Sequence, residues 1–278
     1  MPSYLTEIIA AHRAAAARDD RDPAELEAQA MGVRSPRPFR AALAGADATG
    51  LAVIAEVKRR SPSAGDLAPD LDPSEVARAY AAGGATALSV LTDAAYFGGA
   101  PQDLDAARSS SGLPVLRKDF TVSRADVCDA RLMGADAVLL IAAALSDEEL
   151  AEFSALAARL SLDVLVEVHD DAELARSLDL GADLIGVNQR DLVTFSVDRQ
   201  RAERLAASIP ETVVAVAESG VRDRADAERL AAAGYQGVLV GESVVAAGDR
   251  TAAVRALAGH RVGRRTSLAA RVSGRMPR

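Results

Sequence analysis

Two lysines are the side chains of this sequence best suited to proton chemistry. Only Lys58 and Lys118 are lysine among the 32 basic residues; the other 30 are arginine. Arginine is permanently charged, whereas a lysine amine can shift its pKa and transfer a proton. Lys58 ends the apolar run that starts at Leu51, and Lys118 ends the run that starts at Leu113. A surface lysine more often lies on a polar helix face, so these positions indicate chemistry; the alternative is two leftover lysines.

Acidic, basic and amide side chains lie at the ends of these two apolar runs and of four others. They are Glu56, Arg117, Asp119, Glu167, His169, Asn188, Arg190, Asp191, Glu218 and Glu242. Glu56 and Lys58 are two residues apart, so in a strand they point to the same face. Lysines beside carboxylates supply an acid and a base together, and crowded charges spread their pKa values. One such charge is usually a loop residue or a salt bridge, but its recurrence on six runs predicts a shared polar pocket.

Eight strands are expected, because short β-like runs recur about every 26 residues. They begin near residues 51, 86, 114, 136, 162, 183, 212 and 236. Amphipathic segments of helical period lie between them, and the clearest span residues 73–82, 123–133, 147–160, 171–178 and 223–233. Eight βα units predict an α/β fold of the (β/α)₈ or TIM barrel type. A doubly wound sheet is disfavoured, because no Gly-x-Gly-x-x-Gly follows the first run.

Three segments are expected along the chain. Residues 1–50 form an N-terminal helical extension packed on the barrel, with one helix over residues 3–18 and a less regular stretch around Ser35-Pro-Arg-Pro. Residues 51–258 form the catalytic barrel. Residues 259–278 form an Arg-rich tail, with six arginines and no acidic residue from His260 onward. A polar run of like charges is typical of a disordered end, so we expect the tail to bury little and to be dispensable.

Composition excludes several classes of protein. A net charge of −8 and a pI of about 5.0 argue against a nucleic-acid surface. No apolar run reaches the roughly 18 residues of a membrane span, and the N-terminus lacks a signal-peptide pattern. The sequence therefore predicts a soluble cytoplasmic protein. Cys128 is the only cysteine and is expected to be buried and inert, and three scattered histidines give no support for a metal site.

Two glycine-bearing loops follow the last two expected strands. Gly220 precedes Val221-Arg-Asp and Gly241 precedes Glu242-Ser, and a helix is expected after each. Loops at these places in a barrel often bind phosphate, because backbone N–H groups at a helix start point at an anion. Ordinary turn glycines are the alternative. Together with the strand count, the loops predict a phosphate site to which Lys58 contributes charge.

Seven strings of this sequence resemble those of the indole-3-glycerol phosphate synthase family. They start at Glu56 (EVKRRSPS), Leu91 (LTDAAYFGG), Leu116 (LRKDF), Val166 (VEVH), Gly186 (GVNQRDL), Ala217 (AESG) and Leu239 (LVGES). The resemblance covers about residues 4–256. The KRRSPS and RKDF strings are the most specific to the family. Gln189 stands where asparagine is expected, and its side chain need not enter the pocket.

The resemblance implies a carboxy-lyase of tryptophan biosynthesis. Its substrate is 1-(2-carboxyphenylamino)-1-deoxyribulose 5-phosphate. The enzyme closes the pyrrole ring, expels carbon dioxide and then water, and yields indole-3-glycerol phosphate. No cofactor, metal, nucleic acid or membrane is implied, and a monomer is favoured.

The resemblance also implies roles for the matching residues. Lys118 is the general acid that protonates the carbonyl oxygen during ring closure, and Glu167 and Lys58 are the candidates for the later proton transfers. The residues placed around the rest of the substrate are Glu56, Asn188, Arg190, Phe120, Glu218 and Ser219. Those placed at the phosphate end are Ser61, Gly220, Gly241, Glu242 and Lys58.

Other functions fit parts of the pattern. Another phosphate-binding barrel enzyme, such as a Schiff-base aldolase or a sugar-phosphate isomerase, would share the glycine loops. Related isomerases are described with aspartate or Cys/Asp pairs, whereas this sequence offers lysine and glutamate after its first, third and fifth runs. A non-catalytic barrel that serves as a scaffold or ligand sensor would not need both lysines.

Overall fold

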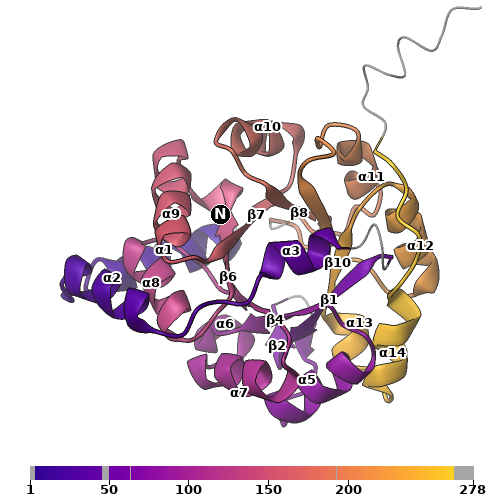
Figure 1. Ribbon diagram of the computed structural model, residues 1–278, viewed down its shortest axis with the longest axis horizontal. Coiled ribbons are helices and arrows are strands. Elements are labelled where there is room, and N and C mark those ends of the chain that lie inside the picture. The colour runs from indigo at the N-terminus through magenta and orange to yellow at the C-terminus, as the bar shows by residue number, and fades with distance from the viewer. Residues whose placement is uncertain (1–3, 46–49, 63, 192, 266–278) are drawn as a thin grey trace, which may run out of the picture.

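The computed structural model describes residues 4–45, 50–62, 64–191 and 193–265. Eight parallel strands close into a barrel in the order β1-β10-β9-β8-β7-β6-β5-β4 (Figure 1). They are β1 (Ala52–Val57), β4 (Ala87–Leu91), β5 (Val115–Lys118), β6 (Ala137–Ile141), β7 (Asp163–Val168), β8 (Leu184–Asn188), β9 (Val214–Glu218) and β10 (Gly237–Val240). The predicted (β/α)₈ barrel is confirmed, and every strand begins within two residues of its expected start.

Helices cover the outside of the barrel between successive strands. They are α5 (Pro73–Ala82), α6 (Ala94–Phe97), α7 (Pro101–Ser111), α8 (Arg124–Leu132), η1 (Ala142–Ala144), α9 (Asp147–Arg159), α10 (Asp171–Asp179), α11 (Arg201–Ala206), α12 (Arg224–Ala232), α13 (Glu242–Val245) and α14 (Arg250–Leu257). Side-chain caps fix several starts: Asp72 accepts the N–H groups of Ser74 and Glu75, and Ser146 forms a capping box with Glu149. Among the described residues, no helix is both long and apolar enough to cross a membrane.

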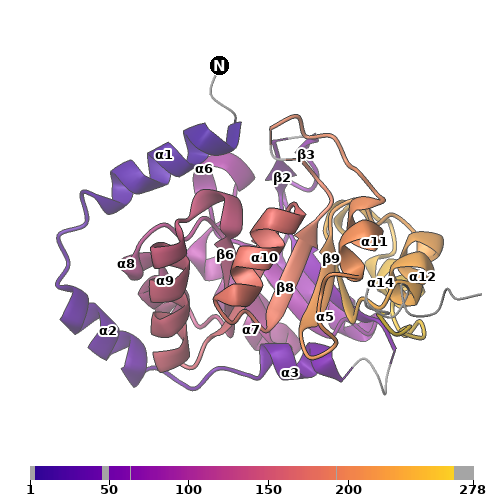
Figure 2. The ribbon, with the colours of Figure 1, turned by 90° about the horizontal axis from the view of Figure 1, so that it is seen from above.

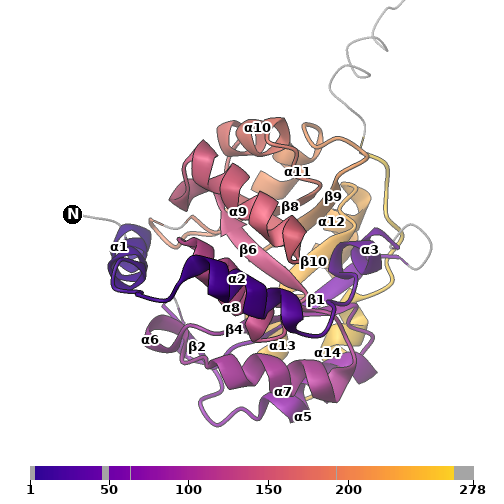
Figure 3. The same ribbon diagram turned by 60° about the vertical axis from the view of Figure 1, so that its left-hand side comes forward.

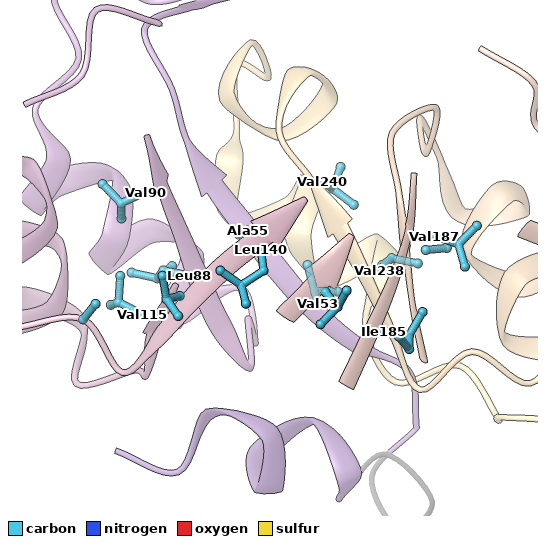
Figure 4. Close-up of a cluster of buried hydrophobic side chains, with 14 of the residues drawn as sticks. Val53, Ala55, Leu88, Val90, Val115, Leu140, Ile185, Val187, Val238 and Val240 are labelled. Carbon is cyan, nitrogen blue, oxygen red and sulfur yellow. The ribbon is translucent and has the colours of Figure 1, made fainter. Parts of the chain in front are cut away.

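Strand side chains alternate between two cores. The outer core lies between strands and helices and includes Val53, Leu88, Leu140, Ile185 and Val238 (Figure 4). The inner core fills the barrel and contains Ile54, Leu116, Leu139, Leu165, Val216 and Leu239. Because the side-chain period of a strand is two, the residue two positions after an inner-core residue also faces the interior, nearer the C-terminal mouth. Because of this alternation, the charged side chains at the strand ends point into the barrel mouth.

The described part of the N-terminal extension, residues 4–45, contains three helices, so the expectation of a single helix is wrong. They are α1 (Tyr4–Ala16), α2 (Pro23–Gly32) and α3 (Phe39–Ala44). Figure 2 shows α1 and α3 at opposite ends of the barrel, and Figure 3 shows α2 lying along α8. Phe39 and Leu43 of α3 belong to the inner core and close its lower end. Asp22 followed by Pro23 is a helix-start signal that marks α2, since Asp22 accepts two N–H groups there.

The first residues of the C-terminal tail pack on the barrel, contrary to the expectation that the tail buries little. Gly259 N–H donates to Leu51 O over 3.0 Å, and His260 O accepts from Leu51 N–H over 2.7 Å. Arg265 is 6% exposed, and its guanidinium donates to backbone oxygens of Gly234 and Val213 over 2.7 and 2.6 Å. A guanidinium has five donors and suits such a cluster of carbonyls, which the charge pattern alone does not reveal. Residues 266–278 lie outside the described residues.

The tail contacts lead to a stability prediction. Deleting residues 259–278 should lower Tm by roughly 5–10 °C, because carbonyls left without Arg265 cost about 1–3 kcal/mol each. Deleting only residues 266–278 should change Tm much less. Arg265→Ala should reproduce most of the loss, whereas Arg264→Ala, at the exposed neighbouring position, should not. Equal melting temperatures for the two truncations would contradict the prediction.

Candidate active site

A cavity of about 520 Å³ opens at the C-terminal end of the barrel. The site residues predicted from the sequence all line it: Glu56, Lys58, Ser61, Lys118, Phe120, Glu167, Asn188, Arg190, Glu218, Ser219, Gly220, Gly241 and Glu242. They come from six strands and the loops that follow them. Ser63 and Leu192, which belong to the family-like strings, lie outside the described residues. The structure therefore brings the predicted set together, while the chemical role of each member remains a prediction.

Lys118 stands at the centre of the charged groups. Its Nζ donates to Glu167 Oε2 over 3.0 Å and lies 3.4 Å from Glu218 Oε2. The lysine side chain is 16% exposed, and both carboxylates are almost fully buried. Two acidic side chains that are almost inaccessible to solvent thus meet one ammonium group.

Burial and charge move the pKa values of these groups in different directions. Burial lowers the pKa of Lys118, but the carboxylates of Glu167 and Glu218 outweigh it and the net pKa is raised. Burial raises the pKa of Glu167, but Lys118 and the hydrogen bonds to its carboxylate outweigh it and the net pKa is lowered. Burial and the neighbouring carboxylates raise the pKa of Glu218 to about 8. At neutral pH the centre therefore holds an ammonium, a carboxylate and a carboxylic acid.

The raised pKa of Glu218 predicts a pH-dependent stability. Above about pH 4.5 the unfolded chain loses this proton while the folded chain keeps it to about pH 8, so the free energy of unfolding falls as pH rises between these values. The glutamine of Glu218→Gln cannot titrate, so the variant does not show this fall in the free energy of unfolding. The Tm of the variant relative to the wild type should therefore increase from about pH 4 to about pH 9. A difference in Tm that stays constant across this range would contradict the assignment.

A second ion pair forms the wall beside the centre. Lys58 Nζ lies 2.6 Å from Glu56 Oε1, which confirms that the two side chains share a face. Ser89 Oγ donates to Glu56 Oε2 over 3.2 Å and fixes the carboxylate from the neighbouring strand. Burial raises the pKa of Glu56, but Lys58 and Lys118 outweigh it and keep the net pKa low. Lys58 is thereby held at the cavity in a defined position.

Asn188 and Arg190 extend the polar wall toward the loops. Asn188 Nδ2 donates to Glu167 Oε1 over 3.0 Å, and Asn188 Oδ1 accepts from the backbone N–H of Arg190 over 3.0 Å. The guanidinium of Arg190 donates to Phe195 O over 3.2 Å and lies 3.8 Å from a Glu242 carboxylate oxygen. Asn188 therefore orients the carboxylate of Glu167. The guanidinium N–H groups of Arg190 lie at the cavity mouth, where they can donate hydrogen bonds to a ligand.

Two glycines leave room for these carboxylates. A Cβ on Gly241 would lie 2.5 Å from Glu56 Oε1 and 2.9 Å from Lys58 Nζ. A Cβ on Gly186 would lie 2.0 Å from Glu218 Oε1. Since real Cβ atoms do not approach so closely, any larger residue at either position must displace the charged groups. Gly241 thus shapes the pocket floor as well as opening a loop.

The turn after β9 has unusual backbone geometry. Ser219 has a φ of 64° and Gly220 a φ of 74°, and a serine in this left-handed region costs conformational energy. Gln189 Nε2 donates to Ser219 O over 2.7 Å and supports the turn from β8. Gln189 is fully buried and does not line the cavity, as expected. Its side chain therefore acts on the turn beneath the pocket.

Apolar residues also line the cavity, and the sequence reasoning missed most of them. Tyr4, Leu5 and Ile8 of α1 line the cavity together with Phe97 and Phe120. The rings of Phe97 and Phe120 lie 6.2 Å apart, within the range of aromatic pairs. Nothing in the pattern of α1 distinguishes a helix that covers a site from one that covers a surface. The cavity thus combines a charged wall with an apolar wall.

Three possible metal ligands also meet beside the cavity. Ligand atoms of His12, Asp93 and Asp119 lie within 4.8 Å of one another, although the residues are far apart in sequence. His12 Nε2 lies 3.1 Å from Asp93 Oδ2, and Arg117 donates to Asp119 over 3.0 Å. These contacts already give each carboxylate a basic partner that would compete with a metal ion. The set is better explained as the anchor of α1 on the barrel.

Comparison with known proteins agrees with this arrangement. The sequence model of the family described as indole-3-glycerol phosphate synthase matches residues 5–257. Indole-3-glycerol phosphate synthase 2 of Streptomyces coelicolor is 49% identical over 239 residues, which are 86% of this chain and 92% of that protein. Indole-3-glycerol phosphate synthase of a Nocardioides species is 51% identical over 227 residues, 81% of this chain and 85% of that protein.

A solved structure shares the fold at low sequence identity. Thiamine phosphate pyrophosphorylase from Pyrococcus furiosus superposes with a TM-score of 0.57 at 20% identity, over 75% of this chain and 94% of that one. This likeness concerns the barrel alone. The match to the family model and the identities to the two synthases are evidence for the family itself. The chain belongs to the indole-3-glycerol phosphate synthase family.

Proposed function

We propose that Lys118 and Glu167 carry out the main proton transfers of the family's reaction in this chain. The enzyme is a carboxy-lyase of tryptophan biosynthesis. It converts 1-(2-carboxyphenylamino)-1-deoxyribulose 5-phosphate to indole-3-glycerol phosphate by ring closure, decarboxylation and dehydration. The observation that carries the proposal is the partly buried Lys118 ammonium, 3.0 Å from Glu167 and 3.4 Å from Glu218, in a cavity that is also lined by apolar residues.

Ring closure needs a proton at the substrate carbonyl oxygen. As the aromatic ring carbon attacks the carbonyl carbon, negative charge develops on that oxygen, and Lys118 stabilises it and delivers a proton. The carboxylates around Lys118 keep it protonated until the substrate arrives. Ring closure also creates an iminium, which accepts the electron pair released when carbon dioxide leaves, so decarboxylation requires no electron-sink cofactor.

Dehydration needs an acid and a base on the two sides of the new ring. We assign the base to Glu167, because its lowered pKa keeps it a carboxylate at neutral pH. Lys58, held 2.6 Å from Glu56, is the acid for the leaving hydroxyl. The ammonium and carboxylate groups of the cavity thus supply both proton transfers without a further group.

The two ends of the cavity suit the two ends of the substrate. The apolar wall of Tyr4, Ile8, Phe97 and Phe120 suits the anthranilate ring. The residues proposed to hold its carboxylate and the sugar hydroxyls are Glu56, Asn188, Arg190, Glu218 and Ser219. Those proposed at the phosphate are Ser61, Gly220, Gly241, Glu242 and Lys58.

The phosphate assignment predicts competitive inhibition by inorganic phosphate. An isolated anion at such a site should bind with an inhibition constant on the order of millimolar, near 4 kcal/mol of binding energy. Steady-state kinetics at constant ionic strength, with chloride as the control anion, would measure it. Non-competitive inhibition would place the anion elsewhere and contradict the assignment.

A covalent trapping experiment separates this mechanism from a Schiff-base aldolase. Borohydride is added while the enzyme turns over the carbonyl substrate, and the intact protein is weighed by mass spectrometry. The proposed mechanism predicts no adduct, because Lys118 donates a proton and never forms an imine. An adduct on Lys118 or Lys58 would overturn it in favour of the aldolase mechanism.

The setting of the enzyme completes the proposal. Amino-acid biosynthesis from a phosphorylated small molecule supports a place in the cytoplasm. We also propose a monomer, which light scattering at catalytic concentration would test. A stable dimer would contradict that part alone.

A further inference from the structure

His169 is a partly buried titratable residue beside the cavity that the mechanism above does not use. It lies two positions after Glu167, its side chain is 12% exposed, and it does not line the cavity. Its ring Nε2 is 3.4 Å from Glu167 Oε1, and its ring Nδ1 is 3.0 Å from Glu173 Oε2. The imidazole therefore stands between two carboxylates, one of which is the proposed base.

Glu173 fixes the position of this imidazole. It lies in the first turn of α10, where its backbone N–H donates to the capping residue Asp170 over 2.8 Å. The same Oε2 that meets the ring also accepts the backbone N–H of His169 over 2.7 Å. Since both ends of the contact are held by regular structure, the ring has a defined orientation toward Glu167.

The charges around the ring favour the imidazolium form. Burial lowers the pKa of His169, but Glu167 on its own strand and Glu173 on α10 outweigh it and raise that pKa to about 10. From other strands, Lys118 donates to Oε2, Asn188 donates to Oε1, and the Glu218 side chain also shares a hydrogen bond with the Glu167 carboxyl group. His169 and Asn188 thus share Oε1, while Oε2 stays with Lys118.

We propose that His169 is a positioning residue for Glu167. Its imidazolium holds Oε1 away from the reacting centre, keeps Oε2 turned toward Lys118, and stabilises the carboxylate form that accepts a proton. Glu173 orients the imidazolium for this task. The inference rests on the proposed role of Glu167 as the base of dehydration.

The test is the pH dependence of kcat and KM for His169→Asn and Glu173→Gln. We expect His169→Asn to lower kcat about tenfold, which corresponds to about 1.4 kcal/mol, with a smaller change in KM. Loss of the cation should raise the pKa of Glu167, so the acid limb of kcat should move up by about one pH unit. Glu173→Gln should move the limb in the same direction by less. His260→Asn is the matched control, since His260 lies 3.7 Å from a glutamate outside the cavity.

Two results would overturn the inference. The first is that both variants keep the wild-type kcat and the wild-type acid limb of the kcat–pH profile. The second is that kcat falls while the acid limb does not shift, which indicates only a structural role. If His169→Asn fails to fold, Glu173→Gln carries the test by the same criteria. Glu167→Gln distinguishes failure of the proposed function from failure of the positioning role. A wild-type kcat in Glu167→Gln would overturn the proposed role of Glu167 as the base. An inactive Glu167→Gln beside unaltered His169 and Glu173 variants overturns the positioning role alone.

Discussion

Lys118→Arg should lower kcat by roughly 10²–10⁴, with a smaller change in KM. Arginine keeps the positive charge, so the electrostatic attraction to the Glu167 carboxylate survives. Its pKa above about 12 makes it a very poor acid near neutral pH, so the proton transfer to the carbonyl oxygen is lost. Steady-state kinetics with the carboxyphenylamino substrate measure the effect, and a melting curve confirms that the variant is folded.

Lys58→Arg is the matched control for this change. The two lysines are similarly buried, and each has a carboxylate within 3.0 Å. Lys58 protonates only the leaving hydroxyl, after ring closure, and arginine at this position keeps the charge at the phosphate, so we expect its replacement to be the milder of the two. Activity of Lys118→Arg within about tenfold of the wild type would contradict the general-acid role. The first proton transfer would then return to Lys58.

Asp136→Ala should lower the free energy of unfolding by about 3–5 kcal/mol, because it leaves a buried arginine without its counter-ion. Asp136 is fully buried at the N-terminal end of β6. Its carboxylate accepts from the Arg108 guanidinium over 2.7 Å, from Arg37 N–H over 2.6 Å and from Val115 N–H over 2.8 Å. One side chain therefore ties the N-terminal extension, α7 and β5 together.

Asp105→Ala on the exposed side of α7 is the control for this prediction. Asp105 is exposed and accepts a hydroxyl hydrogen bond from Ser109 over 3.3 Å. Chemical denaturation of both variants would compare the free energies of unfolding. Any Asp136→Ala protein that remains folded should keep its kcat, because Asp136 lies at the opposite end of the barrel from the cavity. Equal destabilisation by the two changes would show that the buried network contributes little.

The barrel and the strand-borne site residues could be predicted because both depend on local patterns. A continuous apolar run with a charge at its end gives the strand, and the period of two gives the face. Glu56 and Lys58 show this directly: their spacing predicted a shared face, and the structure places them 2.6 Å apart. The burial of Cys128 was expected because a free cysteine in a helical stretch is usually buried, and it is confirmed.

Features that depend on contacts between distant segments could not be predicted. Tyr4 and Ile8 reach the cavity only because α1 crosses the barrel mouth. Arg265, which follows the last element of the barrel, is buried because four backbone oxygens from other segments converge on its guanidinium. The position of His169 between Glu167 and Glu173 depends on how α10 packs against β7. None of these contacts leaves a periodic signal in the sequence.

The most direct test of the account is product formation by the purified chain. The enzyme is mixed with 1-(2-carboxyphenylamino)-1-deoxyribulose 5-phosphate in the presence of a metal chelator, and indole fluorescence and carbon dioxide are followed together. The account predicts indole-3-glycerol phosphate and carbon dioxide in equal amounts, with no added cofactor and with the rate lost in Lys118→Arg. Absence of the indole product, or a cleavage product without carbon dioxide, would contradict it.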